Sequence, residues 1–304
     1  MSIEITLCTP TYNRAYIIEK LYHSLQKQTR KSFEWLVIDD GSVDNTESLL
    51  RKWQKEKNDF VIRYYKTSNG GKHRAVNYSL DLAQGDYYMV VDSDDYLTDD
   101  AVEKLCNWME EIKDNKLIMG VVANRGYSNQ ETPNNYFKEK FLDKNLLDMN
   151  TFEENGKKVL NGERAICFKT DFHKKYKYPE IVGEKFITEA VVYNRMANDG
   201  FKMRFFNDII WIYEYLQDGL SCKGMELYLQ NPMGYGIWIK EKMQFSHMRM
   251  LERFKVYYSF SCDMKKYYNV EMIAKCLRTK KIMICFCLFI HRVWRLKNRQ
   301  KPIY

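Results

Sequence analysis

The stretch GDYYMVVDSDDYL, residues 85–97, joins a β-rich apolar run to a dense group of carboxylates. Residues 87–91 are aromatic or aliphatic, and Asp92, Asp94 and Asp95 follow at once. Such a run, bounded by glycine on one side and acidic residues on the other, is typical of a buried strand. Ligands of open parallel sheets bind at the carboxyl ends of the strands, so we expect these carboxylates to lie at a binding edge.

The segments around this strand alternate between strand and helix patterns. Strand-like runs cover residues 3–8, 33–38, 60–66 and 87–91. Apolar residues at helical spacing follow each run, within residues 17–25, 49–53, 75–83 and 102–109. A repeated β-α order with right-handed crossovers predicts an α/β fold with a Rossmann-like, mostly parallel sheet flanked by helices.

The pattern changes in the second half of the chain. Residues 124–156 are polar and predict a loop over the sheet edge, while residues 164–169 resemble a strand. A helix is indicated over 187–197, and residues 202–216 read as two β segments that meet at Asn207 and Asp208. Beyond Gly219 the sequence is helical and rich in aromatic residues, so we predict domains over 1–221 and 222–304.

The second predicted domain is strongly basic. Residues 240–304 hold 16 basic and 4 acidic side chains, within a chain whose net charge is +8. A helix over 280–299 would fit an anionic membrane surface, and it would equally fit a packing helix with one buried stripe. Nucleic-acid binding is the least favoured use, and we expect no nucleic-acid partner.

Cysteine usage and the N-terminus bear on the compartment. The eight cysteines form no CxxC pair, and the grouping of Cys285, Cys287 and His291 reads as a helix face that contains sulfur rather than as a zinc site. A reducing compartment is indicated. The first residues lack a signal-peptide pattern, and the longest apolar run, 282–290, is about half of a membrane span. We expect a cytoplasmic protein, and a peripheral position on the inner face of the cell membrane depends on which of the two interpretations of the helix over 280–299 holds.

The carboxylates after residue 91 have two interpretations. Mg²⁺ and Mn²⁺ prefer oxygen ligands, and Mg²⁺ often takes only one or two protein carboxylates together with substrate phosphates. Asp92 and Asp94 could supply these ligands. Alternatively, the segment is an acidic turn before a helix, since Thr98, Asp99 and Asp100 suit a helix N-terminus. The residues alone leave both interpretations open.

The ends of the other predicted strands also carry polar groups. A carboxylate after the second strand could accept hydrogen bonds from a base or ribose, and cations after the third strand could meet phosphate. The candidates for nucleotide binding on these ends are Thr9, Tyr12, Asn13, Asp40, Asn69, Lys72 and Arg74. Neither a Walker A loop nor a GxGxxG fingerprint occurs, which argues against P-loop NTPases and dinucleotide-dependent dehydrogenases.

Together, four segments resemble the family-2 glycosyltransferases, which are inverting enzymes of the GT-A fold. They are ITLCTPTYNR (5–14), LVIDDGSVDNT (36–46), NGGKHRAVN (69–77) and GDYYMVVDSDD (85–95). The resemblance covers residues 3–110 and extends more loosely to 216. It implies metal-dependent transfer of a sugar from a nucleotide-sugar, usually a UDP-sugar, to a hydroxyl of a glycan or lipid-linked acceptor, as in bacterial surface polysaccharide synthesis.

The resemblance also implies roles for residues at matching positions. Thr9, Pro10, Tyr12 and Asp40 would hold the nucleotide. Asp92 would contact the ribose, and Asp94, with Asp92 and with Asp95 as a further ligand, would hold Mn²⁺ or Mg²⁺. Many members carry Ala-Arg-Asn after the third strand. The arginine is missing here, where Ala75, Val76 and Asn77 stand, so Lys72 or Arg74 would replace it.

An inverting transferase needs a base for the acceptor hydroxyl. Arg195, Ala197 and Gly200 match the end of the family's helix after its acidic pair, which places Glu189 at the position of the base. Glu184 is the alternative, and a solvated glutamate in a first helical turn is the structural interpretation of Glu189. A protein that keeps the fold and binds nucleotide without turnover is the competing function.

Aromatic residues near the end of the first predicted domain have two uses. Tyr178, Trp211, Tyr213 and Tyr215 would stack on sugar rings or belong to the core.

Overall fold

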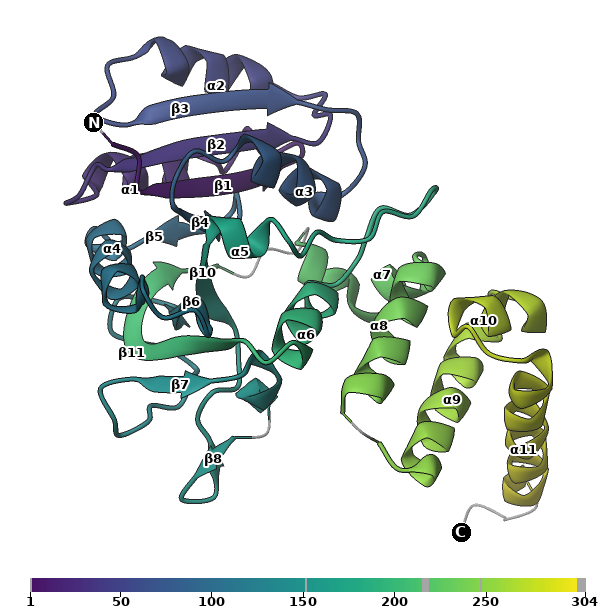
Figure 1. The fold of residues 1–304 in the computed structure, drawn as a ribbon. Coiled ribbons are helices and arrows are strands. Elements are labelled where there is room, and N and C mark those ends of the chain that lie inside the picture. The colour runs from purple at the N-terminus through teal and green to yellow at the C-terminus, as the bar shows by residue number, and fades with distance from the viewer. Residues whose placement is uncertain (1, 151, 215–218, 247, 300–304) are drawn as a thin grey trace. The chain divides into compact units, whose positions relative to one another are not determined.

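The computed structural model describes residues 2–150, 152–214, 219–246 and 248–299 (Figure 1). The chain forms two compact units, residues 1–178 with 195–217, and residues 179–194 with 218–304. The last division, after residue 217, lies close to the boundary predicted after residue 221. The sequence did not indicate that residues 179–194 group with the C-terminal helices.

The first unit is built on a nine-stranded sheet with the order β3-β2-β1-β4-β10-β6-β11-β5, and β7 pairs with β11 at one side. Strands β1 to β4 run parallel, as do β6 and β11, while β10 is antiparallel to β4 and β6. This arrangement confirms the predicted α/β class. The strands are β1 (Ile5–Thr11), β2 (Phe33–Asp39), β3 (Val61–Lys66), β4 (Tyr87–Val90), β5 (Tyr96–Leu97), β6 (Ile118–Gly126), β7 (Leu142–Lys144), β10 (Arg164–Lys169) and β11 (Lys202–Ile212).

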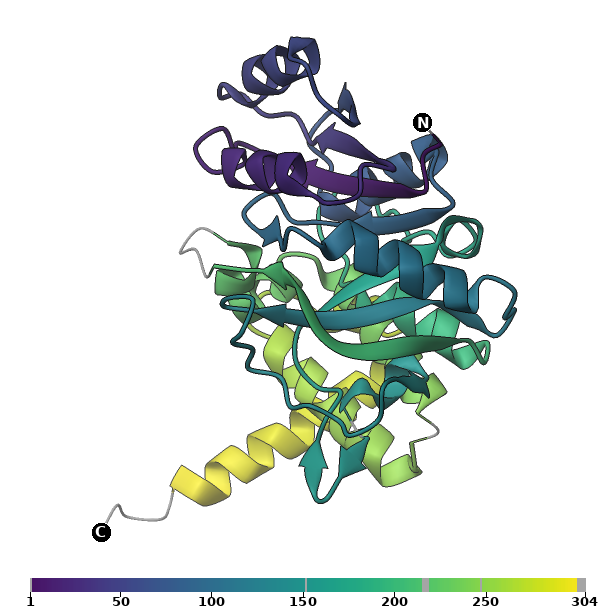
Figure 2. The same cartoon turned by 90° about the vertical axis from the view of Figure 1, so that its left-hand side faces the viewer.

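Helices cover both faces of this sheet (Figures 1 and 2). On one face, α1 (Glu19–Lys27), α2 (Thr46–Lys55) and α4 (Ala101–Ile112) bury their apolar sides in one continuous core with the sheet. On the other face, α3 (Lys72–Leu82) packs on β1 and β2, and α5 (Thr170–His173) packs on β10 and β4. The crossover through α3 returns the chain from the outer strand β3 to the central position of β4, so the ends of β1, β2 and β4 meet at one edge.

Two predictions for the middle of the chain are corrected. Residues 118–126 form a long strand, β6, where the prediction began a loop at residue 124. Residues 202–212 form one strand, β11, rather than two segments that meet at Asn207. Its pairing with β6 shifts register between Phe205 and Ile209, and this irregularity explains the interruption in the apolar pattern. A small hairpin, β8 (Glu153–Glu154) and β9 (Lys157–Lys158), and a 3₁₀ turn, η1 (Leu146–Asn150), lie in the polar region.

The second unit is helical. It contains η2 (Leu220–Lys223), α7 (Gly224–Leu229), α8 (Pro232–Phe245), α9 (Met250–Met264), α10 (Val270–Cys276) and α11 (Lys281–Arg299). Helices α8 to α11 share an apolar core that includes Phe260, Met264 and Ile284. Helix α6 (Ala190–Asn198) begins in this unit and ends in the first.

Among the described residues, no helix combines the length and the apolar character that crossing a membrane requires. The sulfur-containing group on α11 is spread around the helix. Cys287 is buried, Cys285 is exposed, and the ring of His291 is hydrogen-bonded to the hydroxyl of Tyr258. The three side chains therefore do not share one face of α11.

Candidate active site

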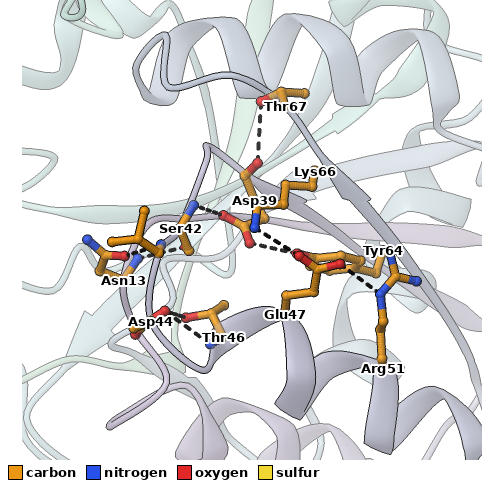
Figure 3. A network of polar contacts seen from close by, with 11 residues as sticks. Asn13, Asp39, Ser42, Asp44, Thr46, Glu47, Arg51, Tyr64, Lys66 and Thr67 are labelled. Atoms are coloured by element: carbon orange, nitrogen blue, oxygen red, sulfur yellow. Dashed lines mark hydrogen bonds and ion pairs between the residues drawn. The ribbon is translucent and has the colours of Figure 1, made fainter.

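Asp39 organises the turn that follows β2 (Figure 3). Its carboxylate accepts the backbone N–H of Ser42 at 2.7 Å and the hydroxyl of Tyr64 at 2.6 Å. Burial, together with the charge of Asp39, raises the pKa of Tyr64, so the phenol keeps its proton and donates. Asp39 is itself fully buried. It therefore fixes the turn that carries the next residue, Asp40, at the sheet edge.

Asn13 links the turn after β1 to the turn after β2. Its backbone N–H donates to Ser42 Oγ at 2.8 Å, and its side-chain oxygen accepts the N–H of Val43 at 2.9 Å (Figure 3). The residue has a positive φ of 53°, a conformation that asparagine tolerates well. The neighbouring Tyr12 is left 45% exposed. Asn13 thus shapes the edge on which the Tyr12 ring is available to a ligand.

The position of Thr9 corrects one prediction. Its side chain is fully buried, and its hydroxyl accepts the indole N–H of Trp35 at 2.9 Å. A strand alternates its side chains between two faces, and Thr9 shares the face of Leu7, which lies in the core. The Thr9 side chain therefore stabilises the sheet and does not face a nucleotide, whereas Pro10, one position later, is partly exposed.

Asp40 holds the glycine loop that precedes α3. Its two carboxylate oxygens accept the backbone N–H groups of Gly70 at 2.7 Å and Gly71 at 2.8 Å, and Asn69 Nδ2 donates to its backbone oxygen at 2.9 Å. Gly71 has φ of 96°, which favours glycine. In the structure the two amides face Asp40 and hold the loop beside it.

Lysine and arginine side chains from α3 reach the same edge. Lys72 Nζ donates to Asp92 Oδ1 at 2.7 Å, which joins the loop before α3 to the end of β4. Arg74 Nη1 donates to the carbonyl oxygen of Gly70 at 2.7 Å. Both cations are partly exposed. Asn77, from the atypical Ala-Val-Asn segment, is buried and bonds both the N–H and the carbonyl of Tyr178.

Arg125, at the end of β6, is a second cation at the carboxylates. Its Nη1 lies 3.6 Å from Asp92 Oδ2 and 3.8 Å from Asp95 Oδ2. Its guanidinium carbon lies 3.7 Å from the centroid of the Trp211 ring, and the indole N–H of Trp211 donates to Asp95 Oδ2 at 2.7 Å. Stacking on Trp211 therefore holds the arginine against the acidic cluster.

The three carboxylates have different protonation tendencies. Burial opposes ionisation of Asp92, but the charges of Lys72 and Arg125 outweigh it and hold the pKa of Asp92 below its usual value. Burial and the charge of Asp92 raise the pKa of Asp94. The same two causes raise the pKa of Asp95 to about 7. The site is therefore short of positive charge, and a bound cation would stabilise the ionised form of Asp94 and Asp95.

We expect Asp95→Asn to stabilise the protein at neutral pH. The folded state keeps the proton of Asp95 up to about pH 7, whereas the unfolded state releases it near pH 4. The contribution of Asp95 to the free energy of unfolding therefore falls as the pH rises from about 4 to about 7. Asparagine cannot ionise and so avoids this loss, and the free energy of unfolding of the variant should exceed that of the wild type by about 4 kcal/mol at pH 8 and by less at pH 5.

The measurement is thermal unfolding of both proteins in EDTA across this pH range. Asp99→Asn is the control, because Asp99 is exposed and should leave the melting temperature unchanged. If the melting temperature of Asp95→Asn at pH 8 is at or below that of the wild type, the pKa of Asp95 is not raised in the folded protein.

The donor set suits a hard divalent cation that also binds substrate oxygens. Within the part of the chain that the structure describes, no three His, Cys, Asp or Glu side chains converge to hold a metal alone. Two carboxylates of the cluster, completed by diphosphate oxygens, would satisfy Mg²⁺ or Mn²⁺. The raised pKa of Asp94 is consistent with this use, since an added positive charge would offset its repulsion by Asp92.

Comparison with known proteins identifies the family. The sequence model described as glycosyl transferase family 2 matches residues 6–170, which is more than half of the chain and includes all the strand ends described above. The chain belongs to glycosyl transferase family 2. The resemblance seen in the sequence motifs is confirmed.

Curated relatives of this family-2 chain are bacterial glycosyltransferases. The poly(ribitol-phosphate) beta-glucosyltransferase of Bacillus spizizenii is 28% identical over 148 residues, which are 48% of this chain and 23% of that protein. TarS of Staphylococcus aureus, a poly(ribitol-phosphate) beta-N-acetylglucosaminyltransferase, is also 28% identical over 148 residues, 48% of this chain and 25% of TarS. Glycosyltransferase MG060 of Mycoplasma genitalium is 38% identical over 97 residues, 31% and 33% of the two chains. The chain thus spans a third or less of each of these relatives.

Solved structures share the fold. TarS 1–349 of S. aureus, in complex with UDP-GlcNAc, matches with a TM-score of 0.58 and 16% identity over 89% of this chain and 82% of that one. The mannosyltransferase PcManGT from Pyrobaculum calidifontis, in complex with GDP-Man and Mn²⁺, matches with a TM-score of 0.57 and 15% identity over 97% and 81%. These matches confirm the GT-A fold of the family-2 chain.

The sequence reasoning missed Arg125 and left two interpretations of the aromatic residues open. Arg125 ends the apolar run of β6, and reading residues 118–126 as a strand would have placed it at the same edge as the aspartates. Trp211 is buried in contact with Arg125, and Tyr178 and Tyr213 are also buried, which supports the core interpretation for all three. Tyr215 lies outside the described residues.

Glu184 has a clear structural role in the second unit of this family-2 chain. Its Oε1 accepts the N–H of Met233 at 2.7 Å and its Oε2 accepts the N–H of Gly234 at 2.8 Å. These amides belong to the first turn of α8, where N–H groups have no partner within the helix. Glu184 is buried, so the carboxylate caps α8 and is poorly placed to act as the base.

We expect Glu184→Ala to lower the free energy of unfolding by about 2 kcal/mol, because it leaves two amides at a buried helix start without acceptors. Chemical denaturation monitored by circular dichroism measures this loss. Glu226→Ala, which removes an exposed glutamate from α7, serves as the control and should change the value by less than about 0.5 kcal/mol. Equal stabilities of the two variants would rule out the capping role.

Glu189 lies directly before α6 and is exposed. Its backbone oxygen accepts the N–H groups of Val192 at 3.0 Å and Tyr193 at 3.1 Å, so it occupies the first turn of the helix. An exposed carboxylate at this position fits a base that an acceptor could reach. It also fits the structural interpretation, in which the carboxylate only complements the helix dipole.

Proposed function

We propose that this family-2 chain is an inverting, metal-dependent glycosyltransferase that uses a UDP-sugar. The observation that carries the proposal is the acidic cluster of Asp92, Asp94 and Asp95 at the end of β4, which Lys72 and Arg125 contact from two other elements. Carboxylates and cations that share one sheet edge suit a metal and a diphosphate together. The UDP complexes of the structurally similar TarS support uridine as the base.

The nucleotide would lie across the ends of β1, β2 and β4. Tyr12, which is exposed beside the turn after β1, would stack on the base, with Pro10 beside it. Asp40 and Asn69 would accept and donate hydrogen bonds to the base or ribose. Asp40 already accepts two amides, but a carboxylate has room for further donors.

The diphosphate would lie between the acidic cluster and the cations. Asp94, with Asp92 and Asp95 beside it, would hold Mn²⁺ or Mg²⁺, and Arg74 would approach the phosphates with Lys72. A metal ion bound there stabilises the negative charge that develops on the leaving UDP. When the donor binds, Lys72 would exchange its contact with Asp92 for phosphate oxygens, and this exchange would compensate for the family arginine that the chain lacks.

Glu189 would act as the base. The acceptor hydroxyl oxygen attacks the anomeric carbon as the bond from that carbon to the diphosphate breaks, and the hydroxyl proton moves to the Glu189 carboxylate. UDP leaves with the bonding electron pair, and the configuration at the anomeric carbon inverts. Exposure of Glu189 is consistent with a bulky acceptor such as a glycan or a lipid-linked sugar.

The setting of this reaction would be the synthesis of a bacterial surface polysaccharide. Curated relatives are named for transfer to poly(ribitol-phosphate), and another is named for teichuronic acid biosynthesis, which supports a polymer as the acceptor. We place the enzyme in the cytoplasm, where nucleotide-sugars are made, peripherally on the inner face of the membrane.

Calorimetry of UDP with the purified chain, with and without Mn²⁺, tests the donor site. Micromolar binding that requires Mn²⁺ is the expected result. Release of UDP from UDP-glucose or UDP-N-acetylglucosamine then separates an active enzyme from a nucleotide-binding scaffold, for which the missing family arginine is the supporting observation. UDP binding without any turnover, in the presence of a range of glycan acceptors, would favour the scaffold. If UDP, GDP and dTDP all fail to bind, the proposal of a nucleotide-binding site at this edge of the sheet is wrong.

A further inference from the structure

Helix α11 exposes an apolar face. Ile282, Phe286 and Phe289 are 75%, 53% and 63% exposed and recur at positions i, i+4 and i+7, so they share one side of the helix. On the other side, Ile284 is fully buried in the core of the second unit, and Cys287 is also fully buried. The helix is therefore apolar on two sides, and the folded unit covers only one of them.

The exposed face continues onto α9. The rings of Phe254 and Phe286 lie 5.9 Å apart. Met250 and Leu251 precede Phe254 by four and three residues, so they lie on the same side of α9. They are 88% and 66% exposed. We call the group formed by residues 250, 251, 254, 282, 286 and 289 the α9–α11 apolar face.

Basic side chains border the α9–α11 apolar face. Arg253 and Lys255 stand about 100° to either side of Phe254 on α9, and Arg292 stands beside Phe289 on α11. All three are exposed. Lys281, at the start of α11, is also exposed and pairs with Glu271 at 2.9 Å. The wider segment 240–304 contains 16 basic and only 4 acidic residues.

An exposed apolar face bordered by basic side chains suits one kind of binding partner. A second copy of the chain would bring two strongly positive surfaces together, and their repulsion would oppose association. An anionic bilayer would instead take the aromatic and aliphatic side chains into its acyl boundary while its phosphates neutralise the surrounding cations. We infer that the α9–α11 apolar face binds the surface of a membrane that contains anionic lipids.

The inference deepens the peripheral location proposed above by naming the surface that would contact the lipid, and it does not depend on the transfer reaction. It would place the second unit of the enzyme at a lipid surface, and it gives a role to an exposed apolar surface that the proposed catalytic residues do not use.

Sedimentation of the full chain with vesicles tests the inference. Vesicles of phosphatidylcholine with phosphatidylglycerol should bind the wild type at least about 10-fold more strongly than vesicles of phosphatidylcholine alone, and about 1 M salt should remove most of this preference. Phe286→Ser combined with Phe289→Ser should weaken binding by at least about 10-fold. Arg253→Glu combined with Arg292→Glu should abolish the preference for the anionic lipid.

A double variant elsewhere controls for the loss of exposed aromatic rings. Tyr136→Ser combined with Tyr267→Ser removes two rings that are each 55% exposed outside the face, and it should bind vesicles as the wild type does. Circular dichroism confirms that each variant is folded. The inference is overturned if the wild type does not bind anionic vesicles, or if the double variant at Phe286 and Phe289 binds them as strongly as the wild type does. It is also overturned if light scattering shows a dimer that this variant dissociates, since the face would then contact a second copy.

Discussion

Replacing Asp94 by alanine is expected to abolish Mn²⁺-dependent binding of UDP and to lower the rate of sugar transfer by at least about 10³-fold. The reason is the position of Asp94 beside Asp92 at the end of β4, where these carboxylates would hold the proposed metal. Calorimetry with UDP and Mn²⁺ measures the first effect, and release of UDP from a UDP-sugar measures the second.

The loss of binding should not arise from unfolding. Burial and the charge of Asp92 raise the pKa of Asp94, so the ionised side chain opposes folding rather than supporting it. The melting temperature of Asp94→Ala in EDTA should therefore equal or exceed that of the wild type. Asp99→Ala, which removes an exposed aspartate before α4, should bind UDP normally. If Asp94→Ala still binds UDP in a Mn²⁺-dependent manner, the metal is held by other residues.

Replacing Glu189 by glutamine is expected to lower transfer by at least about 10³-fold while UDP binding stays unchanged. Glutamine keeps the size and polarity of the side chain but cannot accept the proton of the acceptor hydroxyl. The donor site belongs to other residues, so calorimetry with UDP and Mn²⁺ should give the wild-type result. A selective loss of turnover would distinguish a base from a general structural defect.

The structural interpretation of Glu189 makes a different prediction. If its carboxylate only complements the dipole of α6, Glu189→Gln should lower stability by a few tenths of a kcal/mol and leave turnover near the wild-type value. Glu184→Gln provides the comparison. Because Glu184 caps α8, its variant should lose stability, and any loss of turnover should follow the fraction of unfolded protein. Full transfer activity of the Glu189→Gln variant would show that Glu189 is not the base.

Much of the proposed nucleotide-binding site at the ends of β1, β2 and β4 could be predicted, because the sequence patterns that indicate it are local. Strands β1 to β4 and helices α1 to α4 follow apolar periodicities that short windows of sequence reveal. The candidates Asp40, Lys72 and Asp92 immediately follow or lie near strand ends. A parallel sheet brings such ends to one edge, so their convergence follows from the order of the elements.

Other parts of the site depend on contacts between distant segments. Arg125 joins Asp92 and Asp95 only because β6 enters the sheet beside β10 and β11, a pairing that no local pattern specifies. The same is true of Trp211, which reaches Asp95 across 116 positions. Glu184 could be read as a base until the structure placed α8 against it.

The sequence by itself determined the α/β class, the order of the first four strands and the chemical groups at their ends, because apolar spacing and turn residues act over a few positions. Only the tertiary structure decided which of those groups face the core. It turned Thr9 inward, directed the Gly70 and Gly71 amides to Asp40, and stacked Arg125 on Trp211. These outcomes depend on strand register and on packing between segments far apart in the chain, which the free energy of the whole fold selects.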